Sequence, residues 1–309
     1  MGRRVCPESS CPSRDWEFES LPRRCGISSV GRTLGCGSKC RGFESHMSPI
    51  NFYILYSFEW RVTMYETLRK YIEDSNNIVF FGGAGVSTES GIPDFRSKDG
   101  LYNQHDVQFE KYQPEYLLSR ECLYTNPKVF YEFYRQKMDT RNIEPNITHR
   151  VLAKMEEIGK LKAIVTQNID GLHQKAGSKN VFEIHGTTQR NYCSRCKMKY
   201  PSDFLFDTKD AIPKCECGGL IRPDVTLYGE KLPDEAVDGA IEAISNADML
   251  IIGGTSLQVY PAASYISYFS GNHLVVINRE KIQVLMNEDI DLMIANSLGN
   301  VFSEIDKWI

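Results

Sequence analysis

Four short runs of apolar residues recur along the chain, and each ends in polar residues or glycine. They are NIVFFGG, LKAIVTQNID, ADMLIIGGTSL and HLVVINRE, at residues 77–83, 161–170, 247–257 and 273–280. Continuous apolar runs of this length are typical of strands that are buried on both faces. Helix-like stretches lie between them, such as HRVLAKMEEIGK and DEAVDGAIEAISNA.

Strands that alternate with helices predict a parallel sheet, so the fold class is α/β with a Rossmann-like parallel-sheet domain. The polar residues at the strand ends would then gather along one edge, where open α/β sheets bind ligands. Residues 97–148 and 186–224 interrupt the alternation. We interpret these two regions as a smaller inserted module or modules.

The N-terminal region differs from the rest of the chain. Residues 1–50 are rich in Arg, Ser, Gly, Cys and Pro and show no helical or strand period. Such a segment buries too little apolar surface to offset the entropy lost on ordering. We expect residues 1–63 to be a disordered or spurious extension, with the native start at Met64 or Met47 and a helix from Met64 to about Asn76. A second zinc site built from its five cysteines is the alternative, although their spacing matches no standard finger.

Composition excludes several classes of protein. The 309 residues carry a formal net charge of −4, which does not favour a nucleic-acid-binding protein. No apolar run reaches the roughly 18 residues needed to span a membrane. We expect a cytoplasmic protein with one large domain and a small module, acting as a monomer without nucleic acid or membrane.

A glycine-rich stretch, GGAGVSTESGIPDFR, follows the first predicted strand. Gly83 and Gly85 would let the backbone approach a phosphate, and a following helix could offer its N-terminal amides. A tight turn of purely structural meaning is the alternative. Thr88 stands where dehydrogenase loops carry their third glycine, and no strand ending in Asp or Glu follows about 20 residues later. The loop therefore predicts nucleotide binding but argues against ordinary hydride transfer.

Four cysteines lie close together in the second inserted region, as Cys193-x-x-Cys196 and Cys215-x-Cys217. In a chain that otherwise looks like an intracellular enzyme, such a set indicates a metal more than disulfides. Four thiolates satisfy tetrahedral zinc, and nothing in the motif supplies an open ligand position. We therefore expect one structural Zn²⁺ per chain. A nucleic-acid-binding zinc ribbon is the alternative, but the interval between the two pairs is not strongly basic.

Several motifs occur together and in order: GAGVSTESGIPDFR, TQNIDGLH, EIHG, the four cysteines, GTSL and INRE. This combination resembles the sirtuins, a family of NAD-dependent protein deacylases, and GVSTESGIPDFR resembles their bacterial branch. The resemblance covers about residues 64–309. It implies a protein-lysine deacetylase that transfers the acetyl group from lysine to ADP-ribose and releases nicotinamide and O-acetyl-ADP-ribose.

The resemblance also implies roles for individual residues. His185 would be the general base, which suits an imidazole that titrates near neutrality, and Asn168 and Asp170 would complete the catalytic set. A late adenine contact is expected at Ala295 or Asn296. The predicted NAD-binding residues are Gly83, Ala84, Gly85, Thr88, Asp94, Phe95, Arg96, Gln167, Asn168, Ile169, Asp170, His185, Gly254, Thr255, Ser256 and Asn278.

The segment RPDVTLYGEKLP, residues 222–233, resembles the part of the family that binds substrate. An acetylated-lysine protein or peptide would lie there as an added strand, against Val225, Tyr228 and Gly229, with Val259 opposite. The loop at residues 97–119 contains tyrosines but no Arg. An acidic acyl group would lack its bidentate partner within the loop, so we expect neutral acyl groups to be preferred.

Other functions are open at this stage. The same fold could serve an ADP-ribosyltransferase or an NAD glycohydrolase, or a nucleotide-sensing protein without catalysis. The intact His185 and the predicted peptide groove favour the deacetylase. Taken singly, Asn168, Asp170 and Thr255 could be ordinary capping residues, and we interpret His173 as structural support.

Overall fold

The computed structural model describes residues 49–95, 97, 100–101, 108–280, 282 and 290–309. The chain divides into two compact units, residues 1–58 and 59–309. Of the first unit only the start of helix α1 (Pro49–Asp74) is described, and the predicted extension up to residue 48 lies outside the described residues. All that follows concerns the second unit.

Helix α1 begins at Pro49 rather than at Met64, so the prediction of its start was wrong. Proline is favoured at the first position of a helix, and residues 51–63 contain neither glycine nor proline to end it. The helix ends at Asp74, close to the predicted end at Asn76.

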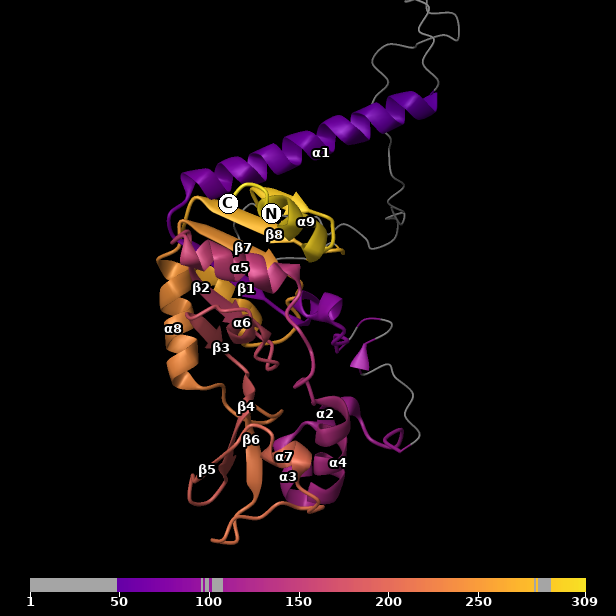
Figure 1. The fold of residues 1–309 in the computed structure, drawn as a ribbon, viewed down its shortest axis with the longest axis vertical. Coiled ribbons are helices and arrows are strands. Elements are labelled where there is room, and N and C mark those ends of the chain that lie inside the picture. The colour runs from indigo at the N-terminus through magenta and orange to yellow at the C-terminus, as the bar shows by residue number, and fades with distance from the viewer. Residues whose placement is uncertain (1–48, 96, 98–99, 102–107, 281, 283–289) are drawn as a thin grey trace, which may run out of the picture. The chain divides into compact units, whose positions relative to one another are not determined.

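A six-stranded sheet forms the centre of the large domain (Figure 1). Its order is β3-β2-β1-β7-β8-β9, and every neighbouring pair is parallel. The four predicted apolar runs form β1 (Ile78–Gly82), β2 (Leu161–Thr166), β7 (Met249–Gly253) and β8 (His273–Ile277). The edge strands are β3 (Val181–Glu183) and β9 (Leu292–Ile294), and neither is among the four apolar runs.

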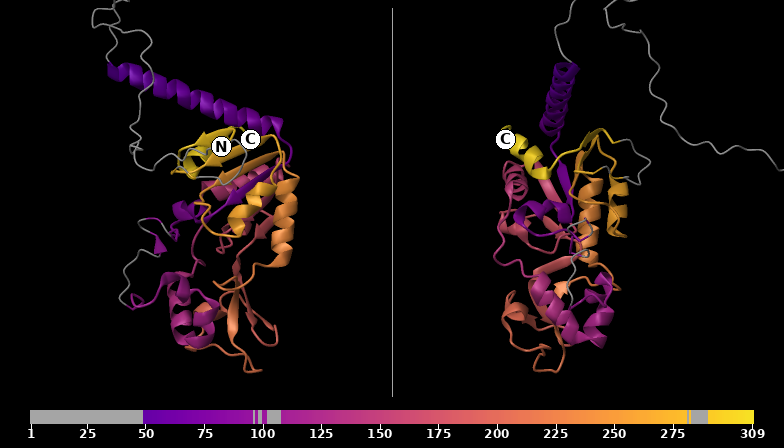
Figure 2. Two further views of the ribbon diagram at one scale, coloured as in Figure 1. Left: turned by 180° about the vertical axis from the view of Figure 1, so that it is seen from behind. Right: turned by 90° about the vertical axis from the view of Figure 1, so that its right-hand side faces the viewer.

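Helices cover both faces of this sheet, because successive strand residues point to opposite sides (Figure 2). Phe80 and Ile251 pack on one side with α1, α5 (Ile147–Glu157) and α9 (Leu298–Ile305). Phe81 and Ile252 pack on the other side with α8 (Asp234–Ser245) and the 3₁₀ helix η4 (Ala262–Tyr268). The strands are thus buried on both faces, as their continuous apolar pattern predicted.

The strand order reverses between β1 and β7, which lie side by side at the middle of the sheet. Connections leave such a pair in opposite directions and open a crevice at the carboxyl ends of the strands. Gly82 of β1 pairs with Gly253 of β7 at this edge. The glycine-rich stretch after β1 and the GTSL motif after β7 therefore meet at the point where open α/β sheets bind ligands.

The two regions that interrupt the alternation form a single small module with its own core. A three-stranded antiparallel sheet, β5 (Lys199–Tyr200), β4 (Gly186–Cys193) and β6 (Ile221–Val225), comes from the second region. Phe130 and Tyr131 of the first region pack in one buried cluster with Leu205 and Ile221 of the second. The module also contains the short helices α2 (Pro114–Leu117), α3 (Arg120–Thr125), α4 (Pro127–Lys137) and α7 (Phe204–Asp207).

None of the helices in the described part of the chain has the length and hydropathy of a membrane span.

Candidate active site

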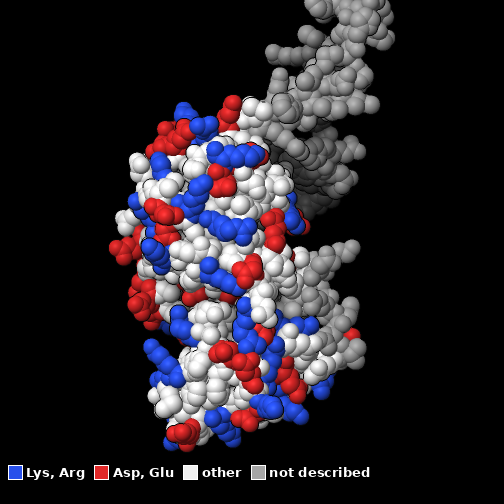
Figure 3. Space-filling model, viewed as in Figure 1, with Lys and Arg blue, Asp and Glu red and all other residues white. Residues whose placement is uncertain are grey.

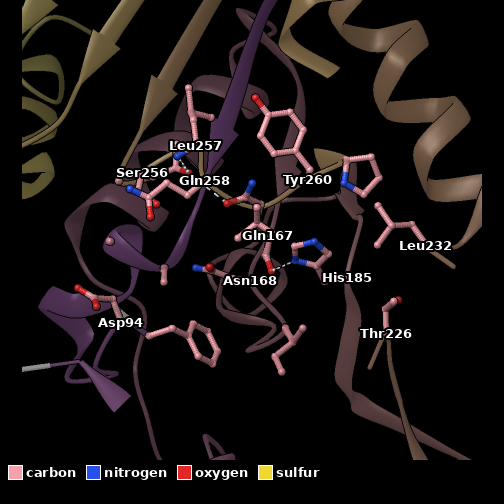
Figure 4. A pocket seen from close by; sticks show the side chains of 18 of the residues that line it. Asp94, Gln167, Asn168, His185, Thr226, Leu232, Ser256, Leu257, Gln258 and Tyr260 are labelled. Carbon is pink, nitrogen blue, oxygen red and sulfur yellow. Dashed lines mark hydrogen bonds between the residues drawn. The ribbon is translucent and has the colours of Figure 1, made fainter. Parts of the chain in front are cut away.

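A cavity of about 1400 Å³ lies at the carboxyl ends of the central strands (Figure 4). It brings together residues from the loops after β1, β2, β7 and β8 and from the segment after β6. The predicted residues that line it are Ala84, Gly85, Thr88, Asp94, Phe95, Gln167, Asn168, Ile169, His185, Val225, Tyr228, Gly229, Gly254, Thr255, Ser256, Val259 and Asn278. Gly83 and Asp170 are buried and do not line it, and Arg96 lies outside the described residues.

The glycines after β1 bring two loops of the sheet into direct backbone contact. The Gly85 amide donates to the Gly254 carbonyl at 2.8 Å, and a Cβ on Gly85 would lie 2.8 Å from the Gly254 Cα. A Cβ on Gly83 would lie 2.8 Å from the Cβ of Thr255. These positions therefore need glycine for close packing between loops, whatever else the loop binds.

No α-helix begins directly after these glycines, so the helix considered there as a source of amides is not formed. The segment instead makes two 3₁₀ turns, Ala84–Val86 and Thr88–Ser90. The Thr88 hydroxyl donates to the Gly85 carbonyl at 3.0 Å, and Gly91 reverses the chain with φ of 91°. Thr88 thus closes the turn with its side chain, a role that a glycine could not fill.

A chain of hydrogen bonds joins the glycine loop to the residues after β2. The Asn168 side-chain amide donates to the Ser87 hydroxyl at 3.0 Å, and that hydroxyl donates to Asp170 Oδ2 at 2.7 Å. Ser87 was not among the predicted residues. It stands 83 positions before Asp170 in the chain, so no local spacing could have revealed this contact.

Asp170 is only 7% exposed, and both of its carboxylate oxygens have partners. Oδ1 accepts from the amide of Leu172, the first residue of helix α6 (Leu172–Lys175), at 2.9 Å, while Oδ2 accepts from Ser87. Burial raises the pKa of Asp170, and the hydrogen bonds from Leu172 and Ser87 oppose that rise. One oxygen therefore holds the first turn of α6, whose N-cap residue is Gly171, and the other accepts from the glycine loop.

His185 lines the cavity with one ring nitrogen already committed (Figure 4). Its Nδ1 lies 2.9 Å from the Gln167 carbonyl oxygen, which can only accept, so Nδ1 carries the proton. In the neutral ring Nε2 is then the acceptor. Burial lowers the pKa of His185, and the backbone hydrogen bond only partly opposes this. His185 is thus held as a neutral imidazole with a basic nitrogen near pH 7.

Gln167 presents an unused donor in the same region. Its Oε1 accepts from the Thr255 hydroxyl at 3.1 Å, whereas its buried Nε2 has no partner among the described residues. An unpaired buried donor costs about 1–3 kcal/mol, which a ligand oxygen could recover. The Gln167 amide, the loop glycines and Thr255 therefore fit a polar ligand such as NAD.

The four cysteines come together as predicted. Their Sγ atoms all lie within 4.8 Å of one another, with 3.4 Å between Cys193 and Cys217 and 3.6 Å between Cys196 and Cys215. A tetrahedral zinc with Zn–S bonds of about 2.3 Å would hold its ligands about 3.8 Å apart. The donor set therefore fits zinc, and none of the four cysteines lines the cavity. This separation suits a structural metal.

Three predictions remain, on the adenine contact, on His173 and on the loop that follows the glycine-rich stretch. Asn296 lines it and Ala295 does not, and the Asn296 side-chain amide donates to Tyr65 of α1 at 3.1 Å. His173 is buried beside Phe80 and outside the cavity lining, as expected for structural support. Much of the loop used to predict acyl preference, including residues 102–107, lies outside the described residues.

Comparison with known proteins identifies the family. The sequence profile of the Sir2 family matches residues 83–261. A protein of Clostridium perfringens named NAD-dependent protein deacetylase is 54% identical over 241 residues, which is 77% of this chain and 96% of the relative. A protein of Cutibacterium acnes with the same name is 49% identical and covers 79% of this chain and 98% of its own length.

Solved structures agree with the sequence relatives. A structure described as Sir2 with p53 peptide and NAD⁺ is 36% identical and superposes with a TM-score of 0.68, covering 79% of this chain and 97% of its own. Another, described as Sir2 bound to acetylated peptide, is 33% identical with a TM-score of 0.69 and covers 78% and 97%. With a glycine loop and a half-buried histidine at one cavity, a cysteine cluster in the small module, and relatives of this identity and coverage, the chain belongs to the Sir2 family.

Proposed function

We propose that this protein is an NAD-dependent protein-lysine deacetylase that takes an acetylated protein or peptide as substrate. The observation that carries the proposal is His185, held neutral by burial and by its bond to Gln167, in the same cavity as the glycine loop. A base and a dinucleotide-binding turn in one cavity suit a reaction that uses NAD at its ribose. The names of the bacterial relatives support the same activity.

The roles of the residues follow from their positions. The turn at Gly83 and Gly85, with Thr255, would hold the phosphates and ribose of NAD, and Gln167 Nε2 would donate to a ribose oxygen. NAD supplies the ADP-ribose that receives the acetyl group. His185 Nε2 would accept a proton from a ribose hydroxyl, a task worth about 10²–10⁴-fold in rate. Asp170 would act through Ser87 and Asn168, because of these three residues only Asn168 lines the cavity.

Zinc would have no part in the chemical step. Cys193, Cys196, Cys215 and Cys217 would hold one Zn²⁺, and Cys193 and Cys215 belong to the buried cluster of the small module. The metal would therefore stabilise that module, and through it the strand β6 that leads to the predicted substrate segment.

Mass spectrometry of NAD and of an acetyl-lysine peptide, incubated with the purified protein, tests the proposal. We expect deacetylated peptide and O-acetyl-ADP-ribose in equal amounts. NAD loss without peptide would favour a glycohydrolase or ADP-ribosyltransferase, and absence of turnover would favour a non-catalytic protein. His185→Ala should abolish deacetylation. His273→Ala is the matched control, because His273 stacks on Tyr71 away from the cavity and should leave turnover unchanged.

We further propose that residues 64–309 form the catalytic domain of a cytoplasmic monomer that prefers neutral acyl groups and does not bind nucleic acid. The visible face of the described chain carries interspersed acidic and basic side chains, without a broad basic area (Figure 3). Light scattering during gel filtration tests the monomer, and equal kcat for the full chain and residues 64–309 tests the domain bounds. Comparison of acetyl and succinyl peptides tests the acyl preference.

A further inference from the structure

A largely buried ion pair joins two residues of the predicted substrate segment, with the Glu230 side chain 18% exposed. Arg222 of β6 is 5% exposed, and its guanidinium donates to both carboxylate oxygens of Glu230, with Nη2 at 2.7 Å from Oε2. Burial alone would raise the pKa of Glu230, but hydrogen bonds from Arg222 and the Leu227 amide outweigh it, and the net pKa is lowered. The pair is therefore charged at neutral pH, and its bidentate geometry fixes both side chains.

The same two side chains also hold the backbone between them. Arg222 Nη2 donates to the Val225 carbonyl at 2.7 Å, and Glu230 Oε2 accepts from the Leu227 amide at 3.0 Å. The ion pair thus spans the turn from Val225 to Glu230 from within. Residues 225–231 all line the cavity, so the conformation of this turn sets the shape of one cavity wall.

Neighbouring contacts connect this wall to the proposed base. The Thr226 amide donates to the His185 carbonyl at 2.9 Å. Beside it, β4 and β6 approach so closely that a Cβ on Gly186 would lie 2.1 Å from the Asp224 carbonyl oxygen. Tyr228 exchanges backbone hydrogen bonds with the segment that precedes α3, its amide donating to Leu118 at 3.0 Å. The turn is therefore held from outside at Thr226 and Tyr228, and the ion pair holds it from within.

Stability alone does not account for a largely buried pair of this kind. Removing two charges from water costs several kcal/mol per ion, and apolar residues of similar volume often stabilise a fold equally well or better. The pair makes directed hydrogen bonds to the Val225 carbonyl and the Leu227 amide, which apolar residues cannot make. Because Glu230 and the turn that the pair holds line the cavity, these hydrogen bonds fix the shape of the cavity wall.

We propose that Arg222 and Glu230 are positioning residues for the acetyl-lysine peptide: they hold residues 225–231 in the conformation that receives the peptide and so set its KM. This inference rests on the proposed function. It concerns the peptide side of the cavity, because no hydrogen bond of the pair reaches the glycine loop or the residues after β7 within the described chain. The NAD side should therefore be unaffected by its loss.

The test is steady-state kinetics of the full chain in which Arg222→Met is combined with Glu230→Leu. This change removes both charges together, so the fold should keep an unfolding temperature close to that of the wild type. We expect the peptide KM to rise about tenfold or more and the KM for NAD to change less than about twofold, the pattern of a lost binding contribution. A double variant that keeps both its unfolding temperature and its peptide KM would overturn the inference.

Two further variants complete the design. Arg190→Gln with Asp224→Asn removes an exposed ion pair, 2.8 Å long, from the same two strands, and it should leave the peptide KM unchanged. If the apolar pair does not fold, Arg222→Lys replaces it, because a lysine cannot form the same fork to Glu230 and the Val225 carbonyl. An unchanged peptide KM in that variant would also refute the inference. Wild-type protein that fails to deacetylate the peptide would count against the proposed function instead.

Discussion

Replacement of Ser87 by alanine would remove the link between the glycine loop and the carboxylate beneath it. The Ser87 hydroxyl donates to Asp170 Oδ2 at 2.7 Å, and Asp170 is 7% exposed, so water cannot readily take its place. A hydrogen bond to a buried charge contributes about 1.5–3 kcal/mol. We expect Ser87→Ala to lower the free energy of unfolding by this amount at pH 7.5.

The loss should depend on pH in a defined direction. Burial raises the pKa of Asp170 in the folded protein, and removal of the Ser87 bond would raise it further. A carboxyl group with a raised folded pKa costs stability above its unfolded pKa of about 3.9, and the cost disappears once both states are protonated. The penalty of Ser87→Ala should therefore be largest at neutral pH and shrink as the pH falls through the raised pKa of Asp170.

Urea unfolding of wild type and variant, at pH 7.5 and at the lowest pH where both fold, measures this difference. Ser90→Ala is the matched control, because the buried Ser90 hydroxyl has no partner among the described residues and its loss should cost little. A penalty that is absent at pH 7.5, or that is equal at both pH values, would show that Ser87 does not stabilise the Asp170 carboxylate.

Three other changes have expected outcomes. Because burial lowers the pKa of His185, kcat/KM for the acetyl peptide should fall only below about pH 6.5, and an inflection above pH 7 would contradict its assignment as the base. Cys215→Ser should reduce the zinc measured by mass spectrometry from about one per chain toward zero and lower the unfolding temperature, whereas full zinc retention would exclude this ligand set. Gly85→Ala would place a Cβ 2.8 Å from backbone atoms of Gly254 and should raise the KM for NAD about 10- to 100-fold. An unchanged KM would show that the loop can move to accommodate the added methyl group.

The large domain was predictable because its strands are buried on both faces. The apolar runs at β1, β2, β7 and β8 stand out in the sequence for that reason, and their polar ends mark the edge that carries the cavity. Strand β9 has only three residues, Leu292–Ile294, too few for a pattern to emerge. The start of α1 was predicted too late because residues 1–50 contain few aliphatic residues, and the following stretch was grouped with them. The helix begins at Pro49, and no glycine or proline ends it before Asp74.

The candidate site was predictable where its residues belong to short sequence motifs, as His185 and the four cysteines do. Contacts between segments that are distant in the chain have no motif in the sequence that would predict them. Ser87 reaches Asp170 across 83 positions, and the proposed role of Arg222 depends on how the chain turns before Glu230. Motifs identify the residue types that a site uses, but only the folded chain decides which of them touch.

The small module has a consequence for recombination between relatives. Its buried cluster is shared by Phe130 from the first inserted region and by Cys193 and Ile221 from the second, although the strand β2 separates the two regions in the chain. A crossover placed between them would join halves of two different cores and leave mismatched volumes around the cysteine cluster. Chimeras that exchange both regions together should express as folded protein, whereas single exchanges should not.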